Sequence, residues 1–252
     1  VMGRLFWLSD HQWRLIKPHL PYRAAGRRRE DDRRIISGII QVLQSGCRWQ
    51  DCPPEYGPPT TIYNRYNRWS QKGIWQYMFA ELTAALAGTP DEVSIDTTHV
   101  KAPAAPVAEK GGFCQAIGRT KGGRNTKVHA ISDAHCRPLA FYLTPGQAAD
   151  ITGAVMLAGS LPDARYLLAD KAYDADHWRA WLKRRRIQPV IPNRSNRNQP
   201  HPFDAKRYRH RNVIERMFGR LKDFRRIATR YDKNAVNFMA AICLAALICY
   251  WI

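Results

Sequence analysis

The strongest constraint on the fold is a change in the period of the hydrophobic pattern near residue 90. Before it, the apolar residues between 35 and 43 recur at helical spacing and stop at Gly46. After it, residues 92–96 alternate between apolar and polar side chains, as a half-buried strand does. The sequence therefore predicts a small all-α domain over residues 1–88 and an α/β domain over residues 89–252.

Three helices are predicted in the first domain. The first is capped by Leu8-Ser9-Asp10 and stops near Pro21, and the second covers residues 35–46. The third begins near Thr60 and turns its apolar side chains inward, so that three basic side chains are expected outside: Arg65, Arg68 and Lys72. Two such helices joined by a turn fit a DNA-binding helix-turn-helix. A helical bundle with a merely solvated basic face is the alternative.

The second domain is predicted to contain a mixed sheet. Residues 127–133 and 138–144 form a strand pair, and short strands follow at 165–170 and 188–191. Helices are expected at 149–158 and 175–185, between or beside those strands. Paired strands followed by strands that alternate with helices indicate a mixed α/β sheet. Residues 101–125 are rich in Ala, Pro, Gly and Lys, and we expect them to form a mobile loop.

The charge of the chain points to a polyanionic partner. Lys and Arg total 40 against 21 Asp and Glu, which gives a net charge of +19 and a pI near 10.1. Such an excess favours a nucleic-acid partner over a neutral metabolite. Residues 178–233 carry 18 Lys or Arg and four Asp or Glu. A smaller basic cluster lies within residues 23–34 and supplies three further candidate DNA contacts: Arg27, Arg28 and Arg29.

Two further features concern compartment and burial. The six Cys are scattered and no signal peptide is apparent, so we expect reduced thiols in a cytoplasmic protein. The longest apolar run, residues 238–252, is short for a membrane span and fits a buried helix, or one that a second subunit covers.

Three carboxylates are the candidate catalytic groups. Asp96 and Asp170 are each predicted to end a strand, where α/β folds usually place their ligands. Glu215 lies in a basic segment, and if that segment is one helix, Glu215 shares a narrow stripe with three other residues: Tyr208, Arg211 and Lys222. An ordinary salt-bridged helix is the alternative.

The same residues carry a family resemblance that covers nearly the whole chain. The spacing Tyr208, Arg211, Glu215, Lys222 resembles the Y-R-E-K signature of bacterial insertion-sequence DDE transposases of the insertion-sequence-four and -five groups. Four other blocks agree with that family: residues 95–102, 118–129, 168–174 and 226–233. Small departures are Ala172, where the family leads us to expect Gly, and the prolines Pro103 and Pro106 after the first block.

The resemblance implies a ribonuclease H-like catalytic domain with Asp96, Asp170 and Glu215 as both the catalytic triad and the metal ligands. It implies Mg²⁺, with Mn²⁺ as a possible substitute, and DNA contacts from Tyr208 and the two signature cations. Hard carboxylate oxygens suit these ions, and two ions can promote an in-line displacement at phosphorus.

The expected function is therefore that of a transposase, which binds terminal inverted repeats and catalyses metal-dependent nicking and strand transfer into target DNA. We expect a homo-oligomer on DNA, no membrane association and a place in the bacterial cytoplasm at the nucleoid. Two alternatives are a catalytically silent protein that binds terminal repeats, and a host nuclease or resolvase of similar fold. Nicking separates the first alternative from the transposase, and terminal-repeat preference separates the second.

Overall fold

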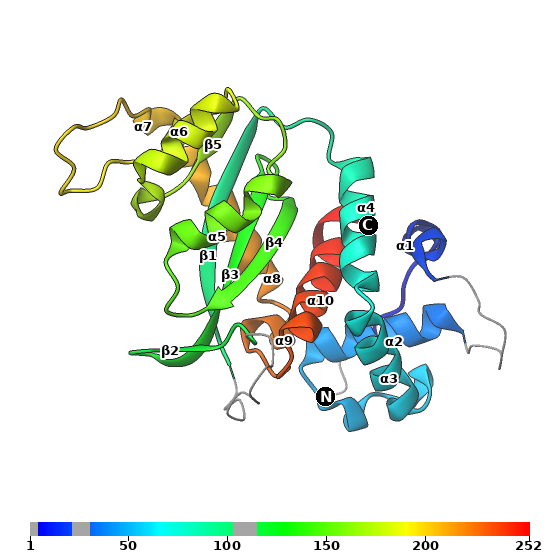
Figure 1. Ribbon diagram of the computed structural model, residues 1–252. Helices are drawn as coiled ribbons and strands as arrows, with labels where there is room; N and C mark the ends of the chain where they lie inside the picture. Colours follow the sequence, from blue (N-terminus) through cyan, green and yellow to red (C-terminus); the bar gives the residue numbers. More distant parts are fainter. Residues whose placement is uncertain (1–4, 22–30, 103–114) are drawn as a thin grey trace. The chain divides into compact units, whose positions relative to one another are not determined.

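The computed structural model describes residues 5–21, 31–102 and 115–252, which fall into two units. The helical unit comprises Val1–Thr83 together with Leu221–Ile252, and the sheet unit comprises Ala84–Arg220. Figure 1 shows the helices of the first unit and the sheet of the second. The predicted fold class, a mixed α/β sheet preceded by helices, is confirmed.

The helical unit is built from helices at both ends of the sequence. These are α1 (Asp10–Ile16), α2 (Asp32–Ser45), α3 (Pro59–Gln71), most of α4 (Ile74–Leu86), α9 (Arg225–Ala228) and α10 (Ala235–Ala246), which continues as a π-helical turn over Leu247–Trp251.

Local signals fix the ends of the first two helices. The Ser9 side chain accepts from the amide of Gln12 and the Gln12 side chain accepts from the amide of Ser9, forming a capping box before α1. Asp31 caps α2 through the amides of the next turn, and Gly46 ends α2 with a φ of 75°. The predicted cap of α1 and the predicted end of α2 at Gly46 are therefore confirmed, whereas the cap at Asp31 was not predicted.

The connection between α2 and α3 differs from the expected helix-turn-helix. It runs over residues 46–58 and contains two 3₁₀ turns, at Trp49–Asp51 and Pro54–Tyr56. A helix-turn-helix joins its helices through three or four residues. These two helices therefore do not form that motif.

Helix α10 packs against α2 and α3, far from it in sequence. The Tyr66 hydroxyl donates to the carbonyl oxygen of Asn237 over 2.6 Å, and the Asn237 amide donates to Asn67 over 3.0 Å. Most side chains of α10 are buried on every side, as its uncharged sequence predicts. The boundary that we expected at residues 88/89 therefore leaves α9 and α10 on the wrong side of the structural division, because their apolar surface is covered by the N-terminal helices.

The sheet unit contains six strands and four helices among its described residues. These are β1 (Glu92–Lys101), β2 (Gly118–Thr120), β3 (Gly123–Asp133), β4 (Pro138–Pro145), α5 (Asp150–Leu157), β5 (Tyr166–Leu168), α6 (Asp176–Arg184), β6 (Gln188–Val190), α7 (Ala205–Tyr208) and α8 (Asn212–Leu221), whose last residue falls in the helical unit.

The strand order is β2-β3-β1-β5-β6, with β4 also paired to β3. Strands β1, β3 and β4 are antiparallel neighbours, whereas β5 and β6 run parallel to β1. Three antiparallel strands followed by two parallel ones agree with the ribonuclease H-like arrangement that the resemblance implies.

Two expectations about this region are wrong. Strand β1 does not end at Asp96 but continues to Lys101, because β3 pairs with it along its whole length. Residues 101–125 are not a loop throughout, since β2 and the start of β3 form an antiparallel pair between Gly118 and Asn125. Residues 103–114 lie outside the described residues.

Helices cover the sheet and enclose its core. Helix α5 packs on β1, β3 and β4, and Figure 1 shows it in front of these strands with α8 behind them. Between α5, α6 and the strands lies a core that includes Ile95, Ile131, Leu167 and Trp178, all at most 2% exposed. In the described part of the chain, no helix has the length and apolar character needed to cross a membrane.

Candidate active site

Asp96 and Asp170 lie beside each other because of the register between β1 and β5. The parallel pairing joins Ser94 to Leu168, which is its last pair. Asp96 lies two residues after Ser94, and Asp170 lies two residues after Leu168. The two acids therefore occupy equivalent positions just beyond the last paired residues. The two carboxylates are close enough for the charge of Asp170 to raise the pKa of Asp96. Asp170 follows the end of β5, close to the strand end that was predicted, whereas Asp96 lies within β1.

The carboxyl group of Asp96 is strongly desolvated. Its side chain is 15% exposed, and one oxygen accepts from the Thr97 amide over 2.7 Å. Burial raises the pKa of Asp96 to about 6, despite the opposing effects of the Thr97 amide and Arg211, and the negative charge of Asp170 adds to the increase. A buried carboxyl group beside a second acid gains most from a nearby cation.

Arg211 is the cation that contacts Asp96 in this structure. Its Nη1 donates to Asp96 Oδ2 over 2.6 Å, while its Nη2 is bonded to a carboxylate oxygen of Glu215. The guanidinium also lies 5.6 Å from the centre of the Tyr208 ring. Three residues of the predicted stripe are thus brought together, and Arg211 bridges the first and third acids of the predicted triad.

The segment that carries this stripe is not one regular helix. It consists of α7, a 3₁₀ turn over Arg209–Arg211 and then α8, so a constant rotation per residue does not apply across it. Arg211 and Glu215 still meet, because they are four residues apart where α8 begins. Lys222 follows the last residue of α8, and burial lowers its pKa. The predicted apolar stripe is confirmed, since Ile214, Met217, Phe218 and Leu221 are buried.

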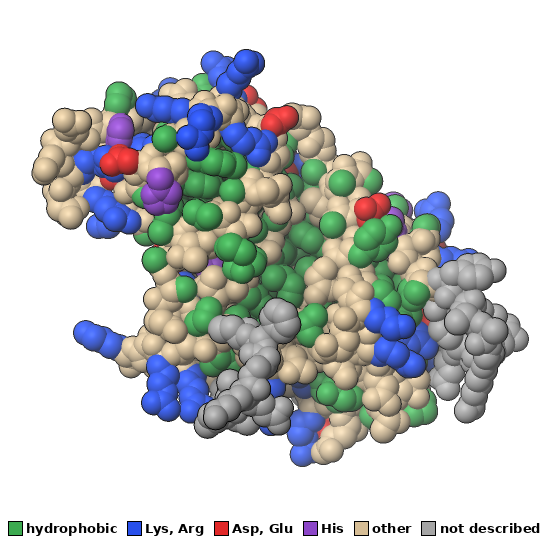
Figure 2. Space-filling model, viewed as in Figure 1, with side chains coloured by type: hydrophobic (Ala, Val, Ile, Leu, Met, Phe, Trp, Pro, Cys, Tyr) green, Lys and Arg blue, Asp and Glu red, His purple; other side chains and the backbone are tan. Residues whose placement is uncertain are grey.

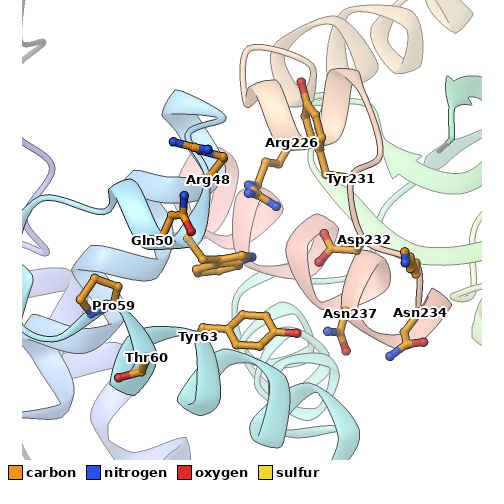
Figure 3. A pocket seen from close by; sticks show the side chains of 12 residues that line it. Arg48, Gln50, Pro59, Thr60, Tyr63, Arg226, Tyr231, Asp232, Asn234 and Asn237 are labelled. Atoms are coloured by element: carbon orange, nitrogen blue, oxygen red, sulfur yellow. The ribbon is translucent and has the colours of Figure 1, made fainter.

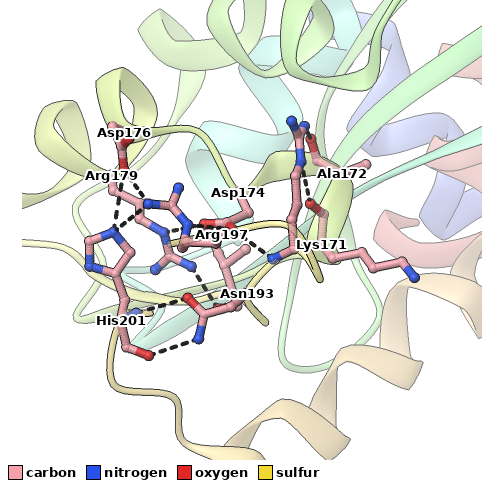
Figure 4. A network of polar contacts seen from close by, with 10 residues as sticks. Lys171, Ala172, Asp174, Asp176, Arg179, Asn193, Arg197 and His201 are labelled. Carbon is pink, nitrogen blue, oxygen red and sulfur yellow. Dashed lines mark hydrogen bonds and ion pairs between the residues drawn. The ribbon is translucent and has the colours of Figure 1, made fainter. Parts of the chain in front are cut away.

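The turn that carries Asp170 is held by a buried ion-pair network (Figure 4). Asp174, whose side chain is fully buried, accepts from Arg179 and Arg197 over 2.7 and 2.8 Å. Arg194 donates through its amide to the same carboxylate, and its side chain donates to the carbonyl oxygens of Lys171 and Ala172. These bonds fix the short 3₁₀ turn that follows Asp170.

A second network of polar contacts, next to Asp96 in the sequence, was not predicted. Lys127 donates to Asp150 over 2.7 Å and to the carbonyl oxygen of Ala148 over 2.7 Å, and the Thr97 hydroxyl donates to Asp150 over 3.0 Å. It ties β1, beside Asp96, to β3 and the start of α5. The available sequence signal was a lysine in the predicted strand 127–133, because a lysine that a sheet buries needs an acidic partner.

The residues of the helical unit that were predicted to contact DNA differ in their exposure. Arg68 and Lys72 are exposed, as expected. Arg65 is not: its side chain is 7% exposed, forms an ion pair with Asp32 and lies over the Trp69 ring. Arg27, Arg28 and Arg29 lie outside the described residues. In the sheet unit, Figure 2 shows Lys and Arg side chains gathered where Figure 1 draws α6.

The residue types at Asp96, Asp170 and Glu215 suit a divalent cation, because they offer only hard oxygen donors. Burial disfavours the charged form of Asp96 and raises its pKa, so a cation beside this carboxyl group would offset that cost. Within 5–21, 31–102 and 115–252, however, no three acidic, His or Cys side chains are arranged to hold a metal ion. The guanidinium of Arg211 instead joins Asp96 and Glu215.

Two family models match the chain. Residues 8–79 match "Putative transposase of IS4/5 family", and residues 87–252 match "Transposase DDE domain". Among curated relatives, "Putative transposase for insertion sequence element IS6501" of Brucella ovis is 37% identical, over 48% of this chain and 93% of that protein. "Putative transposase for insertion sequence element IS402" of Burkholderia cepacia is 31% identical, over 53% of this chain and 70% of that protein.

Solved structures are more distantly similar. A piggyBac transposase synaptic complex with hairpin DNA matches with 12% identity and a TM-score of 0.42, over 77% of this chain and 50% of that chain. A pre-cleavage Mos1 transpososome matches with 10% identity and a TM-score of 0.29, over 94% of this chain and 83% of that chain. A simian T-cell lymphotropic virus intasome matches with a TM-score of 0.38 over 48% of its chain, so the chain spans about half of two of these proteins.

Proposed function

Because this chain belongs to the DDE transposase family, we propose that it nicks DNA at the terminal inverted repeats of an insertion sequence and joins the freed ends to target DNA. The observation that carries the proposal is the register of β1 and β5, which sets Asp96 and Asp170 side by side. A desolvated carboxyl group beside a second acid is poorly explained by stability alone.

We assign Asp96, Asp170 and Glu215 as the ligands of the divalent ions that this family uses, with Mg²⁺ as the physiological ion and Mn²⁺ as its substitute. When bound, such ions supply positive charge that favours a deprotonated attacking oxygen and offsets the charge on the leaving oxygen. Asp96 is the central ligand, since it is the acid that lies next to Asp170 and shares a guanidinium with Glu215.

Arg211 has a second role in this proposal. It now neutralises both Asp96 and Glu215, so Glu215 can serve as a ligand only when the guanidinium moves away. A DNA phosphate is a suitable new partner, because guanidinium groups bind phosphate oxygens in pairs. Tyr208, which precedes Arg211 in the sequence, and Lys222, which follows Glu215, contact the DNA near the cleaved bond.

DNA binding draws on the basic character of the whole chain. We propose that Arg68 and Lys72 contact DNA, together with Arg27, Arg28 and Arg29, within an N-terminal DNA-binding region over residues 1–88. We further propose a homo-oligomer on DNA, because two transposon ends must be held for joining, and a site of action at the bacterial nucleoid.

Nicking of a labelled terminal-repeat duplex in the presence of Mg²⁺ tests the proposal. Asp96→Asn and Asp170→Asn are expected to reduce nicking by at least about 100-fold, because each removes a negatively charged ligand while keeping the side-chain shape. Asp163→Asn is the matched control, since Asp163 is 89% exposed and pairs only with the surface residue Arg185 among the described residues. Nicking that persists in Asp96→Asn would rule out the triad.

A further inference from the structure

The helical unit contains a pocket that the DDE chemistry does not use. It has a volume of about 710 Å³ and is formed by the α2–α3 connection, the start of α3 and the segment between α9 and α10 (Figure 3). All of its lining residues belong to the helical unit. The volume is within the range of pockets that bind small molecules.

Aromatic rings form its walls. Trp49 and Tyr63 lie 5.5 Å apart between ring centres, and Tyr231 lines the pocket with its side chain 53% exposed. The guanidinium of Arg226 lies 5.1 Å from the Trp49 ring and 5.3 Å from the Tyr231 ring. An exposed ring supported on one side by a cation leaves its other face available for a planar ligand.

The pocket also contains unsatisfied polar atoms. Asp232 is 8% exposed, and its Oδ2 has no hydrogen-bond partner among the described residues. The same holds for Nε of Arg226, although its Nη2 donates to the carbonyl oxygen of Cys47 over 2.7 Å. Buried polar atoms are seldom left unpaired, so these two call for a ligand or a water molecule. An unpaired carboxylate oxygen in particular requires an N–H or O–H donor.

Two basic residues at the surface line the pocket. Lys233 is exposed, and Arg48 is paired with Asp51. A ligand that fits the whole pocket is therefore planar, carries an N–H donor for Asp232 and bears a negative charge that reaches Lys233. An amino acid side chain of a protein partner rarely combines these three properties, whereas a nucleotide does.

We propose that this pocket binds one unstacked base of single-stranded DNA, with its ring on Tyr231, an N–H group on Asp232 and its phosphate near Lys233. The inference rests on the proposed function only in taking DNA as the source of the nucleotide. Stacking on aromatic side chains tolerates all four bases, and each of them has an N–H group on its Watson–Crick edge that can donate to Asp232. The base comes from a strand that is locally unpaired, because a stacked pair cannot enter a pocket of this size.

Fluorescence anisotropy with two DNA hairpins tests the proposal. One hairpin is blunt and the other carries a short single-stranded extension. The wild-type protein is expected to bind the extended hairpin about tenfold more tightly, since each stacked base contributes about that factor. Tyr231→Ala should abolish this preference and Asp232→Asn should reduce it. Tyr77→Ala is the matched control, because Tyr77 is 56% exposed in the same unit and does not line the pocket.

Three results would overturn the proposal: equal binding of the two hairpins by the wild type, a preference that survives in Tyr231→Ala, or binding of a free deoxynucleoside monophosphate without any preference for the extension. Nicking of the terminal-repeat duplex is measured on the same preparations. A wild-type protein that nicks DNA but shows no preference for the extension rejects the pocket alone, whereas a wild-type protein that shows the preference but does not nick rejects the proposed catalysis alone.

Discussion

Arg65 and Arg68 are three residues apart, yet their environments are opposite. Arg65 pairs with Asp32 in the interior, and Arg68 is exposed. The spacing along α3 correctly placed Ile62 and Tyr66 inside, but it did not predict the burial of Arg65. Its partner is 33 residues away in sequence, and only the packing of α3 on α2 brings the two together.

This difference predicts two separable effects. Arg65→Met should lower the free energy of unfolding by about 3 kcal/mol, because it removes a buried guanidinium together with its ion pair to Asp32. Arg68→Met should leave stability within about 0.5 kcal/mol of the wild type but weaken DNA binding. Urea denaturation and DNA anisotropy on both variants check this. The assignment fails if Arg65→Met weakens DNA binding while its stability is unchanged.

His129 predicts a pH dependence of stability. It is fully buried, bonded to the Thr144 hydroxyl over 2.7 Å, and burial lowers its pKa to about 4. The unfolded chain has a His pKa near 6.5, so the unfolded state binds more protons between these values. Stability is therefore complete above about pH 6.5 and decreases as the pH falls toward 4, by on the order of 3 kcal/mol.

His129→Gln tests this, because glutamine keeps a polar contact to Thr144 without titrating. Urea denaturation between pH 7 and pH 4 should show a smaller loss of stability in His129→Gln than in the wild type. Other groups, including Asp96 with its raised pKa, titrate in both proteins and cancel in the comparison. Parallel stability curves for the two proteins would contradict the assignment.

At the scale of elements, most helices and strands were predictable from short-range patterns. Ser9, Asp31 and Gly46 mark helix ends through contacts within one turn, and the strands of the β3–β4 hairpin follow from their alternation. The length of β1 was not predictable, because its second half is defined by pairing with β3 rather than by its own polar sequence. The broken helix before Glu215 was missed for a similar reason, since residue spacing does not distinguish a 3₁₀ turn from an α-helical turn.

The network around Asp174 gives a prediction for α6 and the loop after β6. Burial acts to raise the pKa of Asp174, but hydrogen bonds from Arg197, Arg194 and Arg179 lower it to about 2. Asp174→Asn should destabilise the protein by about 3 kcal/mol, because the buried Arg179 loses its counter-charge.

Asp176→Asn is the control, since Asp176 is 78% exposed although it also pairs with Arg197. It should change the free energy of unfolding by less than about 1 kcal/mol. Urea denaturation of both variants at pH 7 distinguishes them. Equal effects would show that the network acts at the surface rather than through its buried acid.

At the scale of the whole molecule, the helical unit draws on both ends of the sequence. Composition and motifs correctly indicated helices, a mixed sheet and the family. They did not indicate that α10 packs on α2 and α3. A helix that is apolar on every side is predicted to be buried, but its sequence does not identify the helices that cover it.

This arrangement predicts how fragments behave. Residues 89–252 contain α10 without the N-terminal helices that cover it, so this fragment should self-associate through exposed apolar surface. Residues 89–220 lack that helix and should remain monomeric. Size-exclusion chromatography with light scattering compares the two. If both fragments are monomeric, α10 does not depend on the N-terminal helices for its cover.

The split composition of the helical unit also sets an order of events on the ribosome. Domains usually fold in the order in which they are translated. Here the sheet unit is synthesised in full before α10. During that time, the apolar surfaces of α2 and α3 that α10 later covers stay uncovered. Completion of the helical unit, which carries the proposed DNA contacts Arg68 and Lys72, therefore comes after that of the sheet unit, which carries the three proposed metal ligands.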